Sequence, residues 1–139
     1  MKIGVIRYRR YEERVLLNEH FVMDDLFRII MNDADFMWFS IIDEKEKILL
    51  STWFPDTESG ALFVKVAPAP VRETEILGTE YDAYRNPQYR YRKKVTWKVG
   101  SYTFSHKRKA VGYVFQTNRR ARHIINFFLE RENRNESNR

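Results

Sequence analysis

Tyrosine and arginine alternate along one short stretch in the second half of the chain. Tyr89, Arg90, Tyr91 and Arg92 follow one another, so an extended backbone would place the tyrosines on one face and the arginines on the other. Proteins that hold single-stranded nucleic acid stack bases on aromatic rings and follow the phosphates with cations. Ordinary strand amphipathicity, with the tyrosines half-buried and the arginines in solvent, is the alternative interpretation of this pattern.

Three arginines, Arg119, Arg120 and Arg122, stand at the expected start of the last helix. The helix macrodipole disfavours cations at that end, whereas the free backbone N–H groups there favour an anion. Arginine side chains beside a helix N-terminus therefore predict a phosphate site. The alternative is that solvent, or carboxylates from the first half of the chain, neutralise these arginines.

Further lysines and arginines complete a candidate phosphate-binding surface. Residues 107–109 form a basic cluster in an expected turn, where cations can grip phosphates, although surface turns often have this composition. Lys94 and Lys98 lie on the polar face of the preceding strand. The expected nucleic-acid contacts are Arg85, Tyr89, Arg90, Tyr91, Arg92, Lys94, Lys98, Lys107, Arg108, Lys109, Arg119, Arg120 and Arg122.

Charge is distributed unevenly between the two halves. Residues 1–84 hold 10 Lys and Arg and 16 Asp and Glu, whereas residues 85–139 hold 15 and 3. The net charges are therefore −6 and +12, which together give the +6 of the whole chain. Such asymmetry is typical of a protein with a polyanionic partner. The acidic half could instead fold against the basic half and cancel its charge. A charge pattern is evidence about association and does not determine the fold.

Patterns for catalysis are weak. Asp43-Glu44-Lys45, with an aspartate upstream, fits the acid-x-Lys pattern of some metal-dependent nucleases, but it falls in an expected charged turn. His20, His106 and His123 could act as general acid and base in a metal-free ribonuclease. The chain has no cysteine, and its five glycines form no phosphate-binding loop. We therefore expect no catalytic residue, no metal site and no cofactor.

Hydrophobic periodicity predicts the elements that position these residues. A Gly100-Ser101 turn is expected to join strands 92–99 and 102–106 into a hairpin. Residues 71–90 show no period, so an irregular connection is expected there. The turn sets the register of the hairpin, with the expected facing pairs Val99 and Tyr102, Trp97 and Phe104, and Val95 and His106.

The last helix is predicted from apolar residues at helical spacing. Ala121, Ile124, Ile125, Phe128 and Leu129 follow the i, i+3, i+4 pattern. Either Thr117 or Asn118 would then be the N-cap. A shorter helix is expected over 23–32, and strands are expected over 2–9, 36–42, 48–54, 61–66 and 110–116.

These elements predict an α+β fold: a single domain over 1–131, in which a mainly antiparallel sheet packs with a long C-terminal amphipathic helix and one short helix. Residues 132–139 are expected to be a flexible polar tail. The sequence has neither a signal peptide nor an apolar run that could span a membrane. We expect a cytoplasmic protein, or a nuclear one in a eukaryote, with no membrane partner.

The function that we expect is non-enzymatic binding of nucleic acid, with a leaning towards single-stranded DNA or RNA. A protein–protein interaction module is the alternative; such an inhibitor, adaptor or subunit would dock on a protein partner through its charge asymmetry. A small nuclease is the second alternative. A homodimer is also expected, from the general frequency of symmetric dimers.

Overall fold

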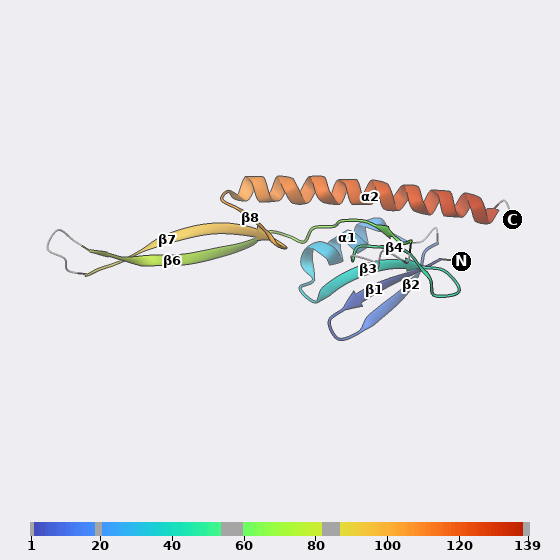
Figure 1. The fold of residues 1–139 in the computed structure, drawn as a ribbon, viewed down its shortest axis with the longest axis horizontal. Coiled ribbons are helices and arrows are strands. Elements are labelled where there is room, and N and C mark those ends of the chain that lie inside the picture. The colour runs from blue at the N-terminus through green and yellow to red at the C-terminus, as the bar shows by residue number, and fades with distance from the viewer. Residues whose placement is uncertain (1, 19–20, 54–59, 82–86, 138–139) are drawn as a thin grey trace.

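The computed structural model describes residues 2–18, 21–53, 60–81 and 87–137 (Figure 1). Side chains are described for the same residues except 79–81, 87–92, 133 and 135–137. Two helices and two sheets make up the described chain, which confirms the expected α+β class. Among the described residues, no helix is both long enough and apolar enough to cross a membrane.

The first half of the chain forms a five-stranded sheet. Its order is β2-β1-β3-β4-β5, and every neighbouring pair is antiparallel except β4 and β5. The helix α1 (Met23–Asn32) connects the β1–β2 hairpin to β3. The strands are β1 (Ile3–Tyr8), β2 (Glu12–Leu16), β3 (Phe36–Ile42), β4 (Ile48–Ser51) and β5 (Leu62–Phe63).

The main core lies between one face of this sheet and the two helices. Phe39, Ile41 and Leu50 are fully buried on the sheet side. Leu26 of α1 and Ile125 of α2 (Lys107–Ser137) are buried against them. Burying a large aliphatic or aromatic side chain contributes about 1.5–3 kcal/mol, so this cluster holds the sheet and the helices together as one body.

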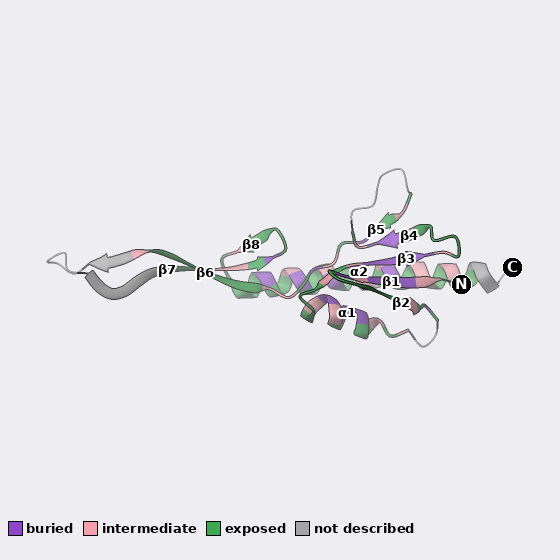
Figure 2. Cartoon of the chain, turned by 90° about the horizontal axis from the view of Figure 1, so that it is seen from below, coloured by how far each residue is buried: buried purple, intermediate pink, exposed green. Residues whose placement is uncertain are grey.

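The second sheet includes a long pair of strands that projects from this body (Figures 1 and 2). Its order is β6-β7-β8, with β6 (Val71–Tyr81), β7 (Pro87–Val99) and β8 (Tyr102–Phe104). We refer to the antiparallel hairpin of β6 and β7 as the arm. A second buried cluster of Ala67, Val99, Ala110 and Val114 packs the base of the arm against the first turns of α2.

The structure corrects two expectations about the C-terminal helix. Residues 110–116 form no strand, and the helix does not begin near Asn118: α2 starts at Lys107 and runs through both positions. The β-branched and aromatic side chains of 110–116 favour a strand locally. However, Ala110, Val114 and Asn118 are spaced four apart and are all buried. Tertiary burial of this stripe outweighs the local preference.

The structure also corrects the irregular connection expected over 71–90, of which residues 82–86 lie outside the described residues. β6 and β7 pair there in register from Val71 opposite Lys98 to Tyr81 opposite Pro87, with irregularities beside Gly78 and before Tyr81. The side chains of residues 71–77 are all exposed. A strand exposed on both faces needs no apolar alternation, so the periodic signal for β6 is absent from the sequence.

Other expectations differ only in extent. The helix over 23–32 and the strand over 36–42 have the expected bounds. The pairs Val99–Tyr102 and Trp97–Phe104 form as expected, but β8 ends at Phe104, so the expected pairing of Val95 with His106 is wrong. The strand expected over 61–66 is reduced to the two residues of β5. α2 includes Ser137, and the flexibility of 132–139 stays a prediction.

Candidate nucleic-acid interface

The net charge of the protein is concentrated in the arm and the segment that follows it. Residues 71–109 hold ten Lys and Arg and four Asp and Glu, a net charge of +6. This equals the net charge of the whole chain, so the remaining residues carry fifteen charges of each sign. A projecting element with the whole excess of positive charge creates a local positive potential for a polyanion.

One face of the arm carries both predicted lysines but is mixed in sign. Lys94 lies opposite Glu75, and Thr96 lies opposite Glu73, so the two glutamates share this face with Lys94 and Lys98. Lys98 Nζ lies 3.0 Å from Glu73 Oε2, and both side chains are about half exposed. Exposed ion pairs of this kind contribute little stability, so a phosphate could compete for Lys98.

The other face of the arm carries two cations that the sequence reasoning missed. Arg72 lies opposite Trp97, and Lys93 lies opposite Ile76. Arg72, Ile76 and Lys93 are exposed, whereas Trp97 packs with the buried cluster at the base of the arm. The sequence reasoning missed Arg72 because no periodicity marks β6 as a strand, so this residue could not be assigned to a strand face. Cations therefore occupy both faces of the described part of the arm.

The start of α2 extends this positive surface. Lys107, Arg108 and Lys109 are exposed in the first turn, where the described chain has no acidic residue. Lys107 Nζ lies 5.2 Å from the centre of the Trp97 ring, a cation–π distance that joins the helix start to the arm. These residues lie in a helix rather than in the turn expected from the sequence. The combination of cations and a helix N-terminus, expected at Arg119, thus occurs here.

Arg119, Arg120 and Arg122 are not at a helix N-terminus, and the structure separates them. They lie in the middle of α2, where consecutive residues point about 100° apart. Arg122 pairs with Asp24 of α1, and its guanidinium carbon lies 4.7 Å from the centre of the Phe27 ring. Within the described chain, no ion pair joins Arg119 or Arg120 to a carboxylate, so the expected neutralisation by the acidic half occurs at Arg122.

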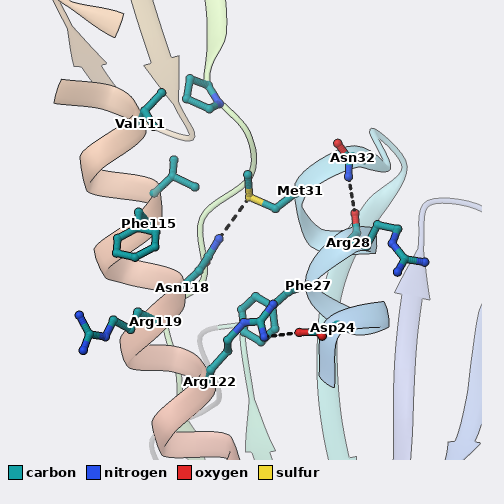
Figure 3. A pocket seen from close by; sticks show the side chains of 12 residues that line it. Asp24, Phe27, Arg28, Met31, Asn32, Val111, Phe115, Asn118, Arg119 and Arg122 are labelled. Carbon is teal, nitrogen blue, oxygen red and sulfur yellow. Dashed lines mark hydrogen bonds and ion pairs between the residues drawn. The ribbon is translucent and has the colours of Figure 1, made fainter. Parts of the chain in front are cut away.

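Arg119 and Arg122 line a groove of about 800 Å³ between α1 and α2 (Figure 3). Phe27, Met31 and Phe115 provide apolar walls. In Figure 3 the Arg122 side chain reaches Asp24 across the groove, whereas the Arg119 guanidinium points away from α1. The groove is therefore mainly apolar, and the Arg122–Asp24 ion pair spans it. Although Arg119 and Arg122 both line it, their guanidinium groups do not converge on one phosphate position.

Arg120 lies on another side of α2, beside a lysine that the sequence reasoning missed. Lys65 and Arg120 line a cavity of about 250 Å³. Lys65 Nζ donates a hydrogen bond to the Tyr102 hydroxyl at 3.1 Å and lies 4.4 Å from the centre of that ring. The nearby hydroxyls of Tyr113 and Tyr102 raise the pKa of Lys65, and the ammonium group lowers the pKa of Tyr102.

The aromatic part of the prediction falls largely outside what the structure describes. Tyr89, Arg90, Tyr91 and Arg92 lie within β7, but their side chains are not described, and Arg85 lies outside the described residues. Trp97 is half-buried at the base of the arm. The exposed Trp53 packs instead on Trp38 of the five-stranded sheet, with ring centres 5.4 Å apart.

The candidate catalytic groups are dispersed. Asp43 Oδ1 accepts hydrogen bonds from the backbone N–H groups of Lys45 and Lys47, which lower its pKa and fix the β3–β4 turn. His106 and His123 are exposed; His106 immediately precedes α2, and His123 lies within it 17 positions later, a span of about 25 Å at the rise of an α-helix. His20 lies outside the described residues. Among the described residues, no group of three or more His, Asp or Glu side chains could hold a metal ion.

Comparison of the chain with protein-family models, with curated proteins and with solved structures finds no match.

Proposed function

We propose that this protein binds nucleic acid without catalysing a reaction on it, through the arm and the first turn of α2. The observation that supports the proposal is the projecting hairpin that, with the following helix start, carries a charge equal to the whole net charge of +6. The contact residues proposed on the described chain are Arg72, Lys93, Lys94, Lys98, Lys107, Arg108 and Lys109.

Phosphate contacts dominate this mode of binding, because the proposed contact residues are lysines and arginines on both faces of a two-stranded ribbon. Neutralising phosphates releases the condensed counterions of the nucleic acid, so affinity falls steeply with salt. Such contacts position the protein without reading base sequence. We therefore propose that binding depends little on the base sequence of the nucleic acid.

Two features of the arm favour different classes of nucleic acid. The Tyr89–Arg92 alternation favours single-stranded DNA or RNA, since tyrosine rings can stack on bases of any sequence. A protruding two-stranded ribbon also has the width to enter the major groove of duplex DNA. We propose single strands as the preferred class and include duplex DNA as the competing substrate in the test.

Fluorescence anisotropy tests the proposal directly. Labelled 20-mers of single-stranded DNA, duplex DNA and RNA are titrated with the full chain at several salt concentrations, with and without Mg²⁺. The proposal predicts binding whose logarithm falls linearly with the logarithm of salt, and no cleavage of any substrate. Absence of binding at low salt contradicts it and favours a protein partner, whereas Mg²⁺-dependent cleavage favours the nuclease alternative.

A further inference from the structure

A small cavity on the flank of α2 lies between that helix and Lys65, next to the last strand of the second sheet. Lys65 enters from the segment after β5, and Tyr113, Gln116, Thr117 and Arg120 come from α2. The cavity has a volume of about 250 Å³. Liquid water occupies roughly 30 Å³ per molecule, so this space holds a tetrahedral oxyanion and part of its hydration shell.

Two cations meet at this cavity without a carboxylate to balance them. Lys65 and Arg120 both line it, and neither forms an ion pair among the described residues. The position of the Lys65 ammonium is fixed, because it donates to the Tyr102 hydroxyl at 3.1 Å and lies against the Tyr102 and Tyr113 rings. Neighbouring hydroxyls raise the pKa of Lys65, so its charge persists at neutral pH.

A buried hydroxyl group is the second observation that points to a ligand. The oxygen of Tyr113 is inaccessible to solvent and has no hydrogen-bond partner of good geometry in the described part of the chain. The Lys65 ammonium and the Tyr102 hydroxyl both lie near this hydroxyl, and Tyr113 raises the pKa of Lys65. Neither contact has good hydrogen-bond geometry, and the ammonium lies 5.3 Å from the centre of the Tyr113 ring. An unpaired buried hydroxyl costs free energy that a ligand acceptor would recover.

We propose that this cavity binds a phosphate group, held by Lys65, Arg120 and the Tyr113 hydroxyl. The guanidinium group of Arg120 matches two phosphate oxygens, the ammonium of Lys65 acts as a point charge, and Tyr113 donates the neutral hydrogen bond. Gln116 and Thr117 supply further polar groups at the same cavity. This site lies apart from the arm, and its existence does not depend on the proposed function.

The phosphate group could belong to a nucleic-acid backbone, where it is a diester, or to a free phosphate or phosphate monoester. The experiment uses ¹⁵N-labelled full-length protein and two probes, inorganic phosphate and the dinucleotide TpT. Amide chemical shifts are followed at constant ionic strength, with NaCl replacing the probe in the reference titration. Tighter binding of TpT assigns the site to a nucleic-acid backbone, and tighter binding of inorganic phosphate assigns it to a free phosphate or monoester.

Three variants locate the binding. Tyr113→Phe removes only the hydroxyl and keeps the ring that packs on Tyr102 and Phe104. Arg120→Gln removes the guanidinium, and Arg131→Gln is the matched control because Arg131 is exposed on the same helix away from the cavity. The wild-type spectrum in the absence of probe, compared with that of each variant, verifies that the fold is intact.

We expect saturable shifts at Lys65, Tyr113, Gln116 and Thr117 in the wild type. Binding of the preferred probe should weaken at least about fivefold in Tyr113→Phe and in Arg120→Gln, and remain unchanged in Arg131→Gln. Shifts that do not saturate, that centre on residues 107–109, or that are equal in wild type, Tyr113→Phe and Arg120→Gln overturn the proposal. Loss of nucleic-acid binding by the arm leaves this result unaffected.

Discussion

The side-chain amide of Asn118 hydrogen-bonds both backbone groups of Ala67. Its Oδ1 accepts from the Ala67 N–H at 2.8 Å, and its Nδ2 donates to the Ala67 carbonyl oxygen at 2.9 Å. Both residues are buried. Ala67 lies in the connection between the two sheets, so this contact attaches the middle of α2 to the point from which the arm departs.

Replacing Asn118 with alanine should destabilise the protein by about 2–4 kcal/mol, because the buried N–H and C=O of Ala67 both lose their partner. Urea unfolding followed by circular dichroism gives the free energy of unfolding. Asn126→Ala is the control, because Asn126 is exposed on the same helix, and it should change stability by less than about 0.5 kcal/mol. Equal stability of the two variants would contradict this role for Asn118.

Asn118 also explains why the start of α2 was misplaced from the sequence. A polar residue preceding an apolar helical stripe is typical of an N-cap, and the residues before it are rich in valine, tyrosine and phenylalanine. In the structure Asn118 continues the buried stripe of Ala110 and Val114, because its polar groups are satisfied by Ala67. That partner is 51 residues away in sequence, so local patterns could not reveal it.

The parts of the fold that were predictable have local signals. α1 has its apolar residues at helical spacing, β3 is apolar except for Ser40, and the Gly100-Ser101 turn fixes the register of β7 and β8. Strand β6 of the arm had no such signal, because both of its faces are exposed over residues 71–77. The charge excess of the candidate interface was visible in the sequence, but the position of Arg119 and Arg120 in the middle of α2, and not at its N-terminus, depends on where the helix begins.

Neutralising the start of α2 should have opposite effects on stability and on binding. The macrodipole disfavours Arg108 and Lys109 in the first turn, so the double variant Arg108→Gln/Lys109→Gln should gain about 0.5–1.5 kcal/mol. The same variant should bind nucleic acid more weakly if these cations contact phosphates. Thermal unfolding and anisotropy titration measure the two effects.

The control for that experiment lies at the other end of α2. Arg134 is in the last turn, where the dipole favours cations, so Arg134→Gln should leave stability unchanged or lower it slightly. Its nucleic-acid affinity should equal that of the wild type. A gain in stability from Arg134→Gln comparable to that of the double variant would argue against a dipole effect.

Tyr102 should ionise at lower pH than an ordinary tyrosine, because the hydrogen bond and the charge of Lys65 favour the phenolate and lower its pKa. Removal of the ammonium in Lys65→Met should raise that pKa towards its usual value. Absorbance at 295 nm follows the titration, and the difference between wild type and Tyr102→Phe isolates this one group. Identical titrations of wild type and Lys65→Met would mean that the contact does not persist in solution.

Gly100 is required by the conformation of the β7–β8 turn. Its φ of +59° is in the left-handed region, while a Cβ added there would meet no atom within 4 Å. Gly100→Ala should therefore cost about 1 kcal/mol from backbone conformation alone, and Gly100→Asn should cost less. Urea unfolding of both variants tests this order, and a larger loss for Asn than for Ala would contradict it.

The salt dependence of binding by two charge-matched variants tests the proposed role of the arm most directly. Lys93→Gln/Lys94→Gln/Lys98→Gln neutralises three exposed cations of the arm, and Arg10→Gln/Lys45→Gln/Lys47→Gln neutralises three exposed cations of the body. Both variants carry the same net charge. If the arm contacts phosphates, its variant should lower the slope of log affinity against log salt by about 2–3, whereas the body variant should keep the wild-type slope. Equal slopes for the two variants would contradict binding through the arm.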